Sequence, residues 1–93
     1  MGDTNLVERY LMLNLLKKCP NSTKYLIREK MMKLQFSIPI STFYLLFNQL
    51  MKEGKIEGYN SLYSVTPEGH RELFRLESKI KIALMGTIWG EKV

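Results

Sequence analysis

Cysteine, histidine and aspartate are scarce in this chain of 93 residues, in which each occurs once. The single cysteine, Cys19, excludes a disulfide within the chain and any zinc site built from several thiolates. Nothing in the sequence orients Cys19 and His70 as a catalytic dyad, and there is no P-loop, GxGxxG or histidine–acid metal-binding pair. We therefore expect a protein that is not an enzyme and that needs neither a cofactor nor a metal ion.

Long apolar runs are also missing. No segment approaches the roughly 18 uninterrupted apolar residues of a membrane-spanning helix, and the N-terminal residues lack the cationic start of a secretion signal. We therefore expect an intracellular protein with no membrane partner. Without repeats or a long linker, the 93 residues are expected to form one domain. A core of this size is marginal alone, which favours a dimer.

Positive charge is what the chain has in excess. The net charge of +5 favours a polyanionic partner. Between Lys17 and Lys33 six cations stand against one anion, Glu29, so that this segment alone carries as much net charge as the whole chain. Basic residues are ten lysines and four arginines, and acidic residues are eight glutamates and one aspartate. This Lys/Glu bias is in the direction seen in hyperthermophiles.

Hydrophobic periodicity predicts a mainly α protein with one small β-hairpin. The expected helices span about residues 4–18, 23–35, 41–53 and 67–85, and the hairpin spans 55–66. Candidate N-caps are Asp3 or Thr4, Ser22 or Thr23, Ser37 or Ser41, and Thr66. Gly54 and Gly86 are placed to end the third and fourth helices, and the hairpin turn is expected within Gly58-Tyr59-Asn60-Ser61.

The third predicted helix is amphipathic. Phe43, Leu46, Phe47 and Leu50 follow the i, i+3, i+4, i+7 spacing of a buried face. The opposite face holds Ser41, Thr42, Leu45, Asn48, Gln49 and Lys52. In the second helix the expected inward stripe is Thr23, Ile27, Met31 and Leu34, with Lys24 and Arg28 together on a flank.

The first and last helices carry more apolar surface than one small domain needs. The first helix is apolar in nearly every direction, so it must be covered on more than one side. The fourth is longer than a compact domain requires and bears a long apolar seam. We therefore predict a homodimer whose interface contains Leu11, Leu15, Leu73, Leu76, Ile80, Leu84 and Trp89.

Helix, glycine, hairpin and threonine-capped helix follow one another in the order of a winged helix-turn-helix with a long C-terminal dimerisation helix. Within this order stand Thr42-Phe43-Tyr44, Phe47, Leu50, Glu53-Gly54, Ile56 and Tyr63-Ser64-Val65-Thr66-Pro67-Glu68-Gly69. In these residues the sequence resembles the winged-helix regulators of the MarR and PadR groups. Its size and Lys/Glu bias resemble the very small winged-helix proteins encoded by viruses of hyperthermophilic archaea.

This resemblance implies a homodimer that places its third helix in the major groove of double-stranded DNA. Asn48 and Gln49 would bond adenine edges and Leu45 would touch a thymine methyl, whereas the alternative is a solvated helix face. Ser41 and Thr42 would serve phosphates or cap the helix. Lys24, Arg28 and Lys52 complete the predicted DNA-binding set, and the alternative for Lys24 and Arg28 is a solvated charge run.

Other residues have simpler interpretations. Tyr44 and Tyr59 are expected to be half-buried packing residues, with a contact to the DNA backbone as the alternative. His70 is expected to be a surface residue. The wing, Tyr59-Asn60-Ser61-Leu62, is short and uncharged, unlike the Arg- or Lys-tipped wings of the family. No small-molecule ligand is indicated.

Cys19 leaves two possibilities open. It is an inert thiol at a helix end, or it bonds to its own copy across a two-fold axis. An odd cysteine invites pairing between molecules, and intracellular proteins of hyperthermophiles do form disulfides. A virus-encoded protein would act in the host cytoplasm.

The leading hypothesis is therefore a homodimeric transcriptional regulator that binds double-stranded DNA sequence-specifically. The alternative is a winged-helix protein-interaction module that binds no specific DNA.

Overall fold

A computed structural model describes residues 5–34 and 38–89, and for residues 83–89 the helical backbone only. Its elements are α1 (Leu6–Lys18), α2 (Lys24–Lys33), α3 (Ile40–Lys52), β1 (Ile56–Tyr59), β2 (Leu62–Val65) and α4 (Pro67–Trp89). The predicted mainly helical chain with one small hairpin is thus confirmed, and the arrangement is compatible with a winged-helix-like fold.

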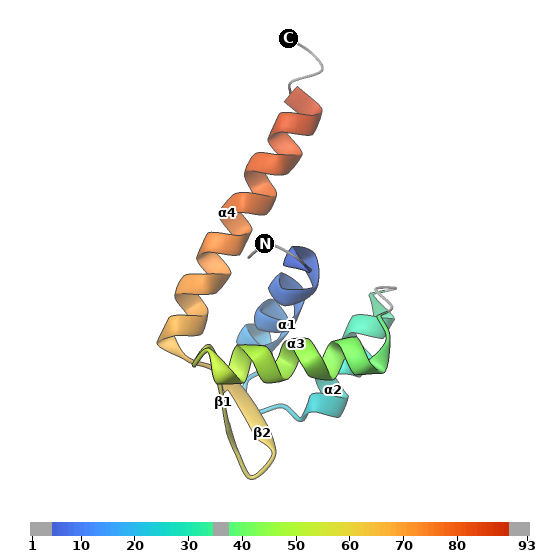
Figure 1. Ribbon diagram of the computed structural model, residues 1–93, viewed down its shortest axis with the longest axis vertical. Coiled ribbons are helices and arrows are strands. Elements are labelled where there is room, and N and C mark those ends of the chain that lie inside the picture. Colours follow the sequence, from blue (N-terminus) through green and yellow to red (C-terminus); the bar gives the residue numbers. More distant parts are fainter. Residues whose placement is uncertain (1–4, 35–37, 90–93) are drawn as a thin grey trace.

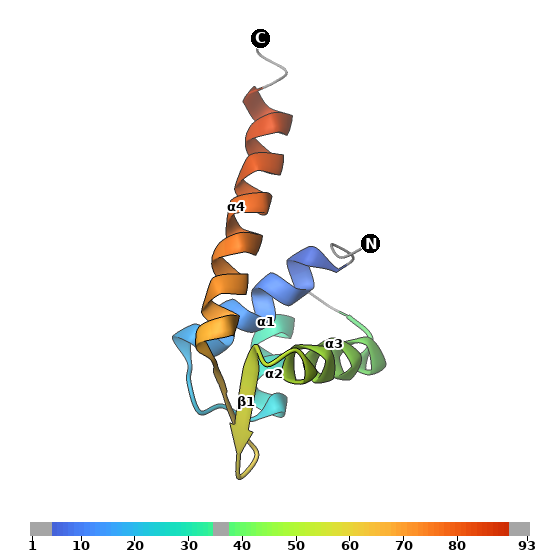
Figure 2. The same cartoon turned by 60° about the vertical axis from the view of Figure 1, so that its left-hand side comes forward.

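The molecule is elongated and measures 52 × 27 × 25 Å. Figures 1 and 2 show α3 and the hairpin at one end, with α1 behind α3. Helix α4 packs along α1 and then continues away from the body toward the opposite end. Within the part of the chain that is described, no helix combines the length and the apolar character needed to cross a membrane.

The core lies where α1, α2 and α3 meet the start of α4. Its buried apolar side chains are Met12, Leu13, Leu16, Ile27, Met31, Phe43, Leu46, Phe47, Leu50, Ile56, Leu73 and Leu76. The whole predicted inner stripe of α3 is among them, as are Ile27 and Met31 of α2. The prediction was wrong for Thr23 and Leu34, which are exposed because they are the N-cap and the C-cap of α2 and lie outside the helix.

Helix boundaries differ from the predictions at other ends as well. Helix α3 begins at Ile40 with Pro39 in the cap position, so Ser41 lies in the first turn and is not the cap. Helix α4 continues through Gly86 to Trp89, because one glycine costs a helix only about 1 kcal/mol. Helix α1 begins at Leu6. The other cap candidates, Asp3, Thr4 and Ser37, lie outside the described residues.

Two threonine caps are confirmed. Thr23 Oγ1 accepts a hydrogen bond from the backbone N–H of Leu26 at 3.1 Å. Thr66 Oγ1 accepts one from Gly69 N–H at 3.0 Å and donates to the carbonyl of Gly54 at 2.5 Å. Thr66 therefore caps α4 and also ties its start to the end of α3, where Gly54 adopts the expected positive φ of 76°.

The hairpin pairs Ile56 with Val65 and Tyr59 with Leu62. Its two-residue loop is Asn60-Ser61, with φ of 53° and 63° respectively. Positive φ at both central residues is the conformation that matches the twist of the strands. Backbone hydrogen bonds between Ser22 and Tyr63, at 2.8 and 3.2 Å, attach the loop before α2 to β2. The hairpin is thus held against the start of α2.

Candidate nucleic-acid interface

One face of α3 is presented to solvent. Leu45, Asn48, Gln49 and Lys52 are exposed, and Leu45 shows 57% of its surface. Their spacing of i, i+3, i+4 and i+7 places them together on the side opposite the buried stripe. Ser41 is exposed one turn before Leu45, and Thr42 is half-buried. Five of the six residues predicted to face a DNA groove are therefore exposed on the outer side of α3, and Thr42 is the exception.

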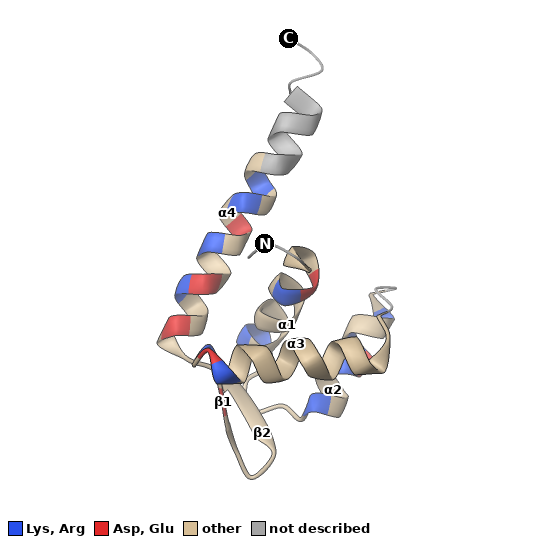
Figure 3. Ribbon diagram, in the orientation of Figure 1, with Lys and Arg blue, Asp and Glu red and all other residues tan. Residues whose placement is uncertain are grey.

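The charge on α3 is also of one sign only. The helix contains no acidic residue, and its one cation is Lys52 (Figure 3). Glu53 follows directly, but its carboxylate accepts hydrogen bonds from Arg9 at 2.7 Å and Lys55 at 2.9 Å. The exposed face of α3 therefore offers amide, hydroxyl, apolar and cationic groups to a partner.

Lys24, predicted as a phosphate contact with a solvated cation as the alternative, is not fully solvated. Its side chain is half-buried, and the ammonium lies over the rings of Phe47, Tyr63 and Tyr44 at 5.3, 5.5 and 5.7 Å from their centroids. It also donates a hydrogen bond to Asn48 Oδ1 at 3.3 Å. Lys24 thereby links α2, α3 and β2.

Arg28, the other predicted phosphate contact on α2, is half-buried. Its Nε is buried and has no hydrogen-bond partner among the described residues. Tyr25, one turn before it, is 70% exposed, and a hydrogen bond with Glu29 raises the pKa of its hydroxyl. The outer surface of α2 thus mixes aromatic, cationic and acidic groups.

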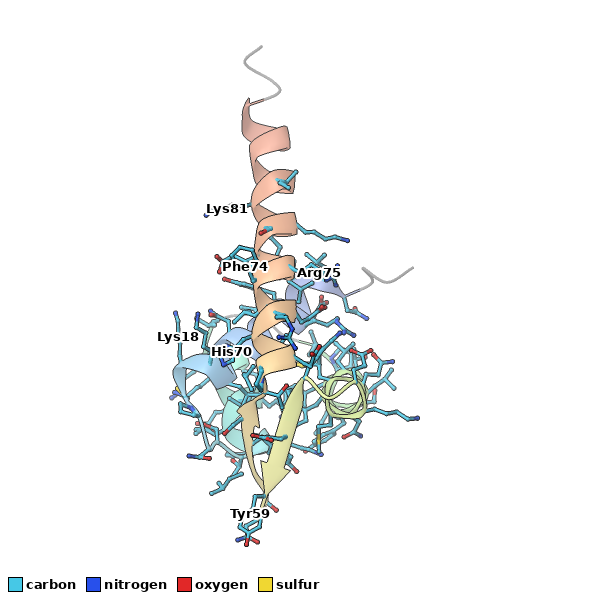
Figure 4. The ribbon with its side chains drawn as sticks, turned by 90° about the vertical axis from the view of Figure 1, so that its left-hand side faces the viewer. Lys18, Tyr59, His70, Phe74, Arg75 and Lys81 are labelled. Carbon is cyan, nitrogen blue, oxygen red and sulfur yellow. The ribbon has the colours of Figure 1, made fainter. Side chains whose placement is uncertain are left out.

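The wing carries no cation. Tyr59 stands at its tip with 81% of its surface exposed (Figure 4), so the prediction of a half-buried packing residue was wrong. Leu62 beside it is also exposed, and Glu57 is the one charged residue between Ile56 and Val65, with Lys55 directly before β1. Tyr59 escapes the core because it adjoins the two-residue turn, where the chain has already left the body.

An ion-pair network at the root of α4 was not predicted from the sequence. Glu72 is 7% exposed, and both of its carboxylate oxygens accept hydrogen bonds from Arg75, at 2.7 and 3.0 Å. Lys55 approaches Glu72 to 3.5 Å, and Arg9 approaches it to 3.9 Å and Glu53 to 2.7 Å. The network joins α1, the end of α3, the start of the hairpin and α4, and so fixes α3 relative to the rest.

Two of the predicted dimer-interface residues belong to the chain's own core. Leu73 and Leu76 are buried in the core cluster, on the helix that packs along α1, which corrects their assignment to a second subunit. Leu11 and Leu15 are half-buried and pack on that core, and Ile80 is half-buried. The side chains of Leu84 and Trp89 lie outside the described residues.

Other apolar residues of α4 are exposed instead. Phe74 shows 73% of its surface and Ile82 shows 69%. They are eight positions apart and lie on one i, i+4 row through Ser78. Figure 4 shows Phe74 pointing away from α4 on the side opposite Arg75. Sequence periodicity missed this face because it is interrupted by polar residues.

Cys19 is a free, half-buried cysteine at the C-cap of α1. A bond to a second copy of Cys19 stays a prediction. His70 is exposed, as predicted.

Comparison with known proteins gives a likeness of fold. No protein-family model matches the chain, and no match is found among curated proteins. The chain is similar to the crystal structure of smu.1704 from Streptococcus mutans UA159, with a TM-score of 0.75 and 27% sequence identity. The match covers 91% of this chain and 89% of that one, so the likeness extends over nearly the whole of both molecules.

Proposed function

We propose that this protein is a winged-helix transcriptional regulator that binds double-stranded DNA sequence-specifically as a homodimer. The observation that carries the proposal is the outer face of α3, where Leu45, Asn48, Gln49 and Lys52 are exposed on a helix without a single acidic side chain. Helix α3 lies at the end of the molecule with the hairpin, so neither α1 nor α4 covers that face (Figures 1 and 2).

The chemistry of this face suits the major groove. The groove is wide enough for an α-helix, and its base edges offer hydrogen-bond donors, acceptors and the thymine methyl group. Asn48 and Gln49 supply side-chain amides, and Leu45 between them supplies an apolar contact. Lys52 at the end of the helix suits a phosphate, and the net charge of +5 attracts the duplex whatever its sequence.

The homodimer is supported by α4. In a single chain its outer row leaves Phe74 and Ile82 in water, and a second copy would remove both from water through a self-complementary contact. A dimer would place two copies of α3 on one duplex, where two half-sites read together raise affinity.

Selection from a library of randomised duplexes tests the function. The wild-type protein should enrich one sequence motif, and binding to it should weaken as salt rises, with a log–log slope of about −0.9 per phosphate contact. Asn48→Ala should erase the preference at one base position, worth about 1–3 kcal/mol. His70→Ala, an exposed change away from α3, should select the wild-type motif. Failure to enrich any motif in low salt would reject specific DNA binding.

A second function is favoured by the wing. The hairpin has no cation to meet the DNA backbone, and it presents Tyr59, Leu62 and Glu57 to solvent. Exposed aromatic and apolar groups of this kind suit a protein partner. A protein-interaction module without specific DNA binding is therefore the alternative, and it is the outcome that an unenriched library would support.

A further inference from the structure

Lys24 is held in one place by aromatic rings from two elements. Its ammonium lies within 6 Å of the centroids of Tyr44 and Phe47 of α3 and of Tyr63 of β2, the range over which a ring face attracts a cation. The rings are themselves fixed by packing. Phe47 is fully buried, and Tyr63 meets it edge-on at 5.0 Å. Tyr44 meets Phe43 edge-on at 5.5 Å.

The hydrogen bond from Lys24 to Asn48 fixes the side chain that the proposed function places in the groove. An ammonium has donors only, so the amide oxygen of Asn48 must be the atom that faces it. The distance from Lys24 Nζ to Asn48 Oδ1 is 3.3 Å. The amide N–H₂ group of Asn48 is consequently directed away from Lys24, and Asn48 is exposed. A free asparagine would present either end of its amide to a base, whereas this one presents its donors.

We propose that Lys24 is a positioning residue for base recognition, which makes Asn48 a hydrogen-bond donor that reads guanine. The inference rests on the proposed function. In the major groove guanine offers two adjacent acceptors, N7 and O6, whereas adenine pairs an acceptor with the N6–H₂ donor. The ammonium of Lys24 behind Asn48 attracts the electronegative guanine edge and repels the adenine amino group. Asn48 therefore favours guanine over the bidentate adenine contact that its residue type alone suggests.

This role differs measurably from a phosphate contact. A lysine that neutralises a phosphate adds about 0.9 to the salt slope and strengthens binding to all sequences alike. Lys24 is engaged by three rings and an amide in the free protein. Its removal should therefore weaken the preference for guanine over adenine and leave the salt slope unaltered.

The test uses Lys24→Met, which keeps an unbranched apolar stem among the rings and removes the charge. Wild-type protein should select guanine at the position whose preference Asn48→Ala erases. Lys24→Met should lower the discrimination of guanine from adenine there by about five- to tenfold, with discrimination at other positions and the salt slope unchanged. Lys24→Arg, which keeps the charge and donors, should retain guanine. Thermal unfolding of each variant checks that it is folded.

Three outcomes would overturn the inference, and they can be told apart. If Lys24→Met weakens binding to all duplexes alike and lowers the salt slope by about 0.9, Lys24 is a phosphate contact and the proposed function stands. If the wild type selects adenine at the position read by Asn48, the inference about Lys24 fails and the proposed function stands. If the wild type selects no motif, the proposed function itself fails.

Discussion

Glu72→Ala is expected to lower the free energy of unfolding by about 3 kcal/mol, the typical cost of removing one partner from a buried ion pair. Glu72 is 7% exposed and is the carboxylate shared by Arg75, Lys55 and Arg9. Without it, the side chains of Arg9 and Lys55, which are 10% and 20% exposed, would be left close together with only Glu53 between them. The loss falls where α1, α3, β1 and α4 meet, so the whole molecule should unfold more easily.

The lowered pKa of Glu72 also predicts how the free energy of unfolding depends on pH. Hydrogen bonds from Arg75 hold the pKa of Glu72 below its ordinary value of 4.5. Burial opposes this effect, and the nearby charges of Lys55 and Arg9 assist it. A carboxyl whose pKa is lowered on folding stabilises the folded state above its unfolded pKa. This stabilisation is lost as the pH falls through the pKa that the carboxyl has in the folded state. The free energy of unfolding of the wild type should therefore decline below about pH 4.5, and that of the Glu72→Gln variant should decline less steeply.

Urea unfolding of wild type and variants, at neutral pH and through the acid range, measures both effects. Glu68→Ala is the matched control, because Glu68 pairs with Arg71 on the same helix but both side chains are largely exposed. An exposed pair contributes less than about 1 kcal/mol. If Glu72→Ala proved as stable as Glu68→Ala, the network would not be what holds α4 to the end of α3.

Phe74→Glu is expected to convert the proposed dimer into a folded monomer. Burying one phenylalanine side chain contributes about 1.5–3 kcal/mol. Two-fold symmetry counts each substitution twice, so the dissociation constant should rise at least about a hundredfold. Two carboxylates brought together across the axis would weaken association further. The chain itself should remain folded, because Phe74 is 73% exposed and takes no part in the core.

Sedimentation equilibrium at micromolar concentration, with circular dichroism for folding, measures this effect. Phe74→Leu keeps an apolar side chain and should remain dimeric, whereas Leu76→Glu should unfold the chain, since Leu76 is buried in the core. A wild-type protein that sediments as a monomer, or a Phe74→Glu variant that stays a dimer, would remove α4 from the interface.

The sequence predicts those parts of the fold that depend on neighbouring residues. The buried stripe of α3 follows from helical periodicity, the caps Thr23 and Thr66 from local hydrogen bonding, and the hairpin turn from Asn60-Ser61. The positions of Leu73 and Leu76 on an apolar seam were also predictable. That seam packs into the chain's own core, however, because α4 lies along α1. Periodicity identifies a face that must be buried and does not say against which partner.

The candidate site was predictable as a set of residues and not as a set of interactions. Arg9 and Glu53 are 44 positions apart, and no local pattern links them. Lys24 was predicted to contact phosphate from the flank of α2, and nothing in the sequence indicated that the fold would bring three rings from residues 44, 47 and 63 around its ammonium. Both interactions arise from packing between elements, which a helical wheel does not contain.

The proposed contact between α3 and DNA can be tested through the amide resonances of the protein during titration with duplex DNA carrying the selected motif. The largest chemical-shift changes should fall between Leu45 and Lys52 and on the side-chain amides of Asn48 and Gln49. The half of α4 around Lys81, far from α3 in Figure 4, should be unaffected. Changes centred on the wing or α4 with α3 unperturbed, or no changes at all, would contradict recognition of DNA through α3.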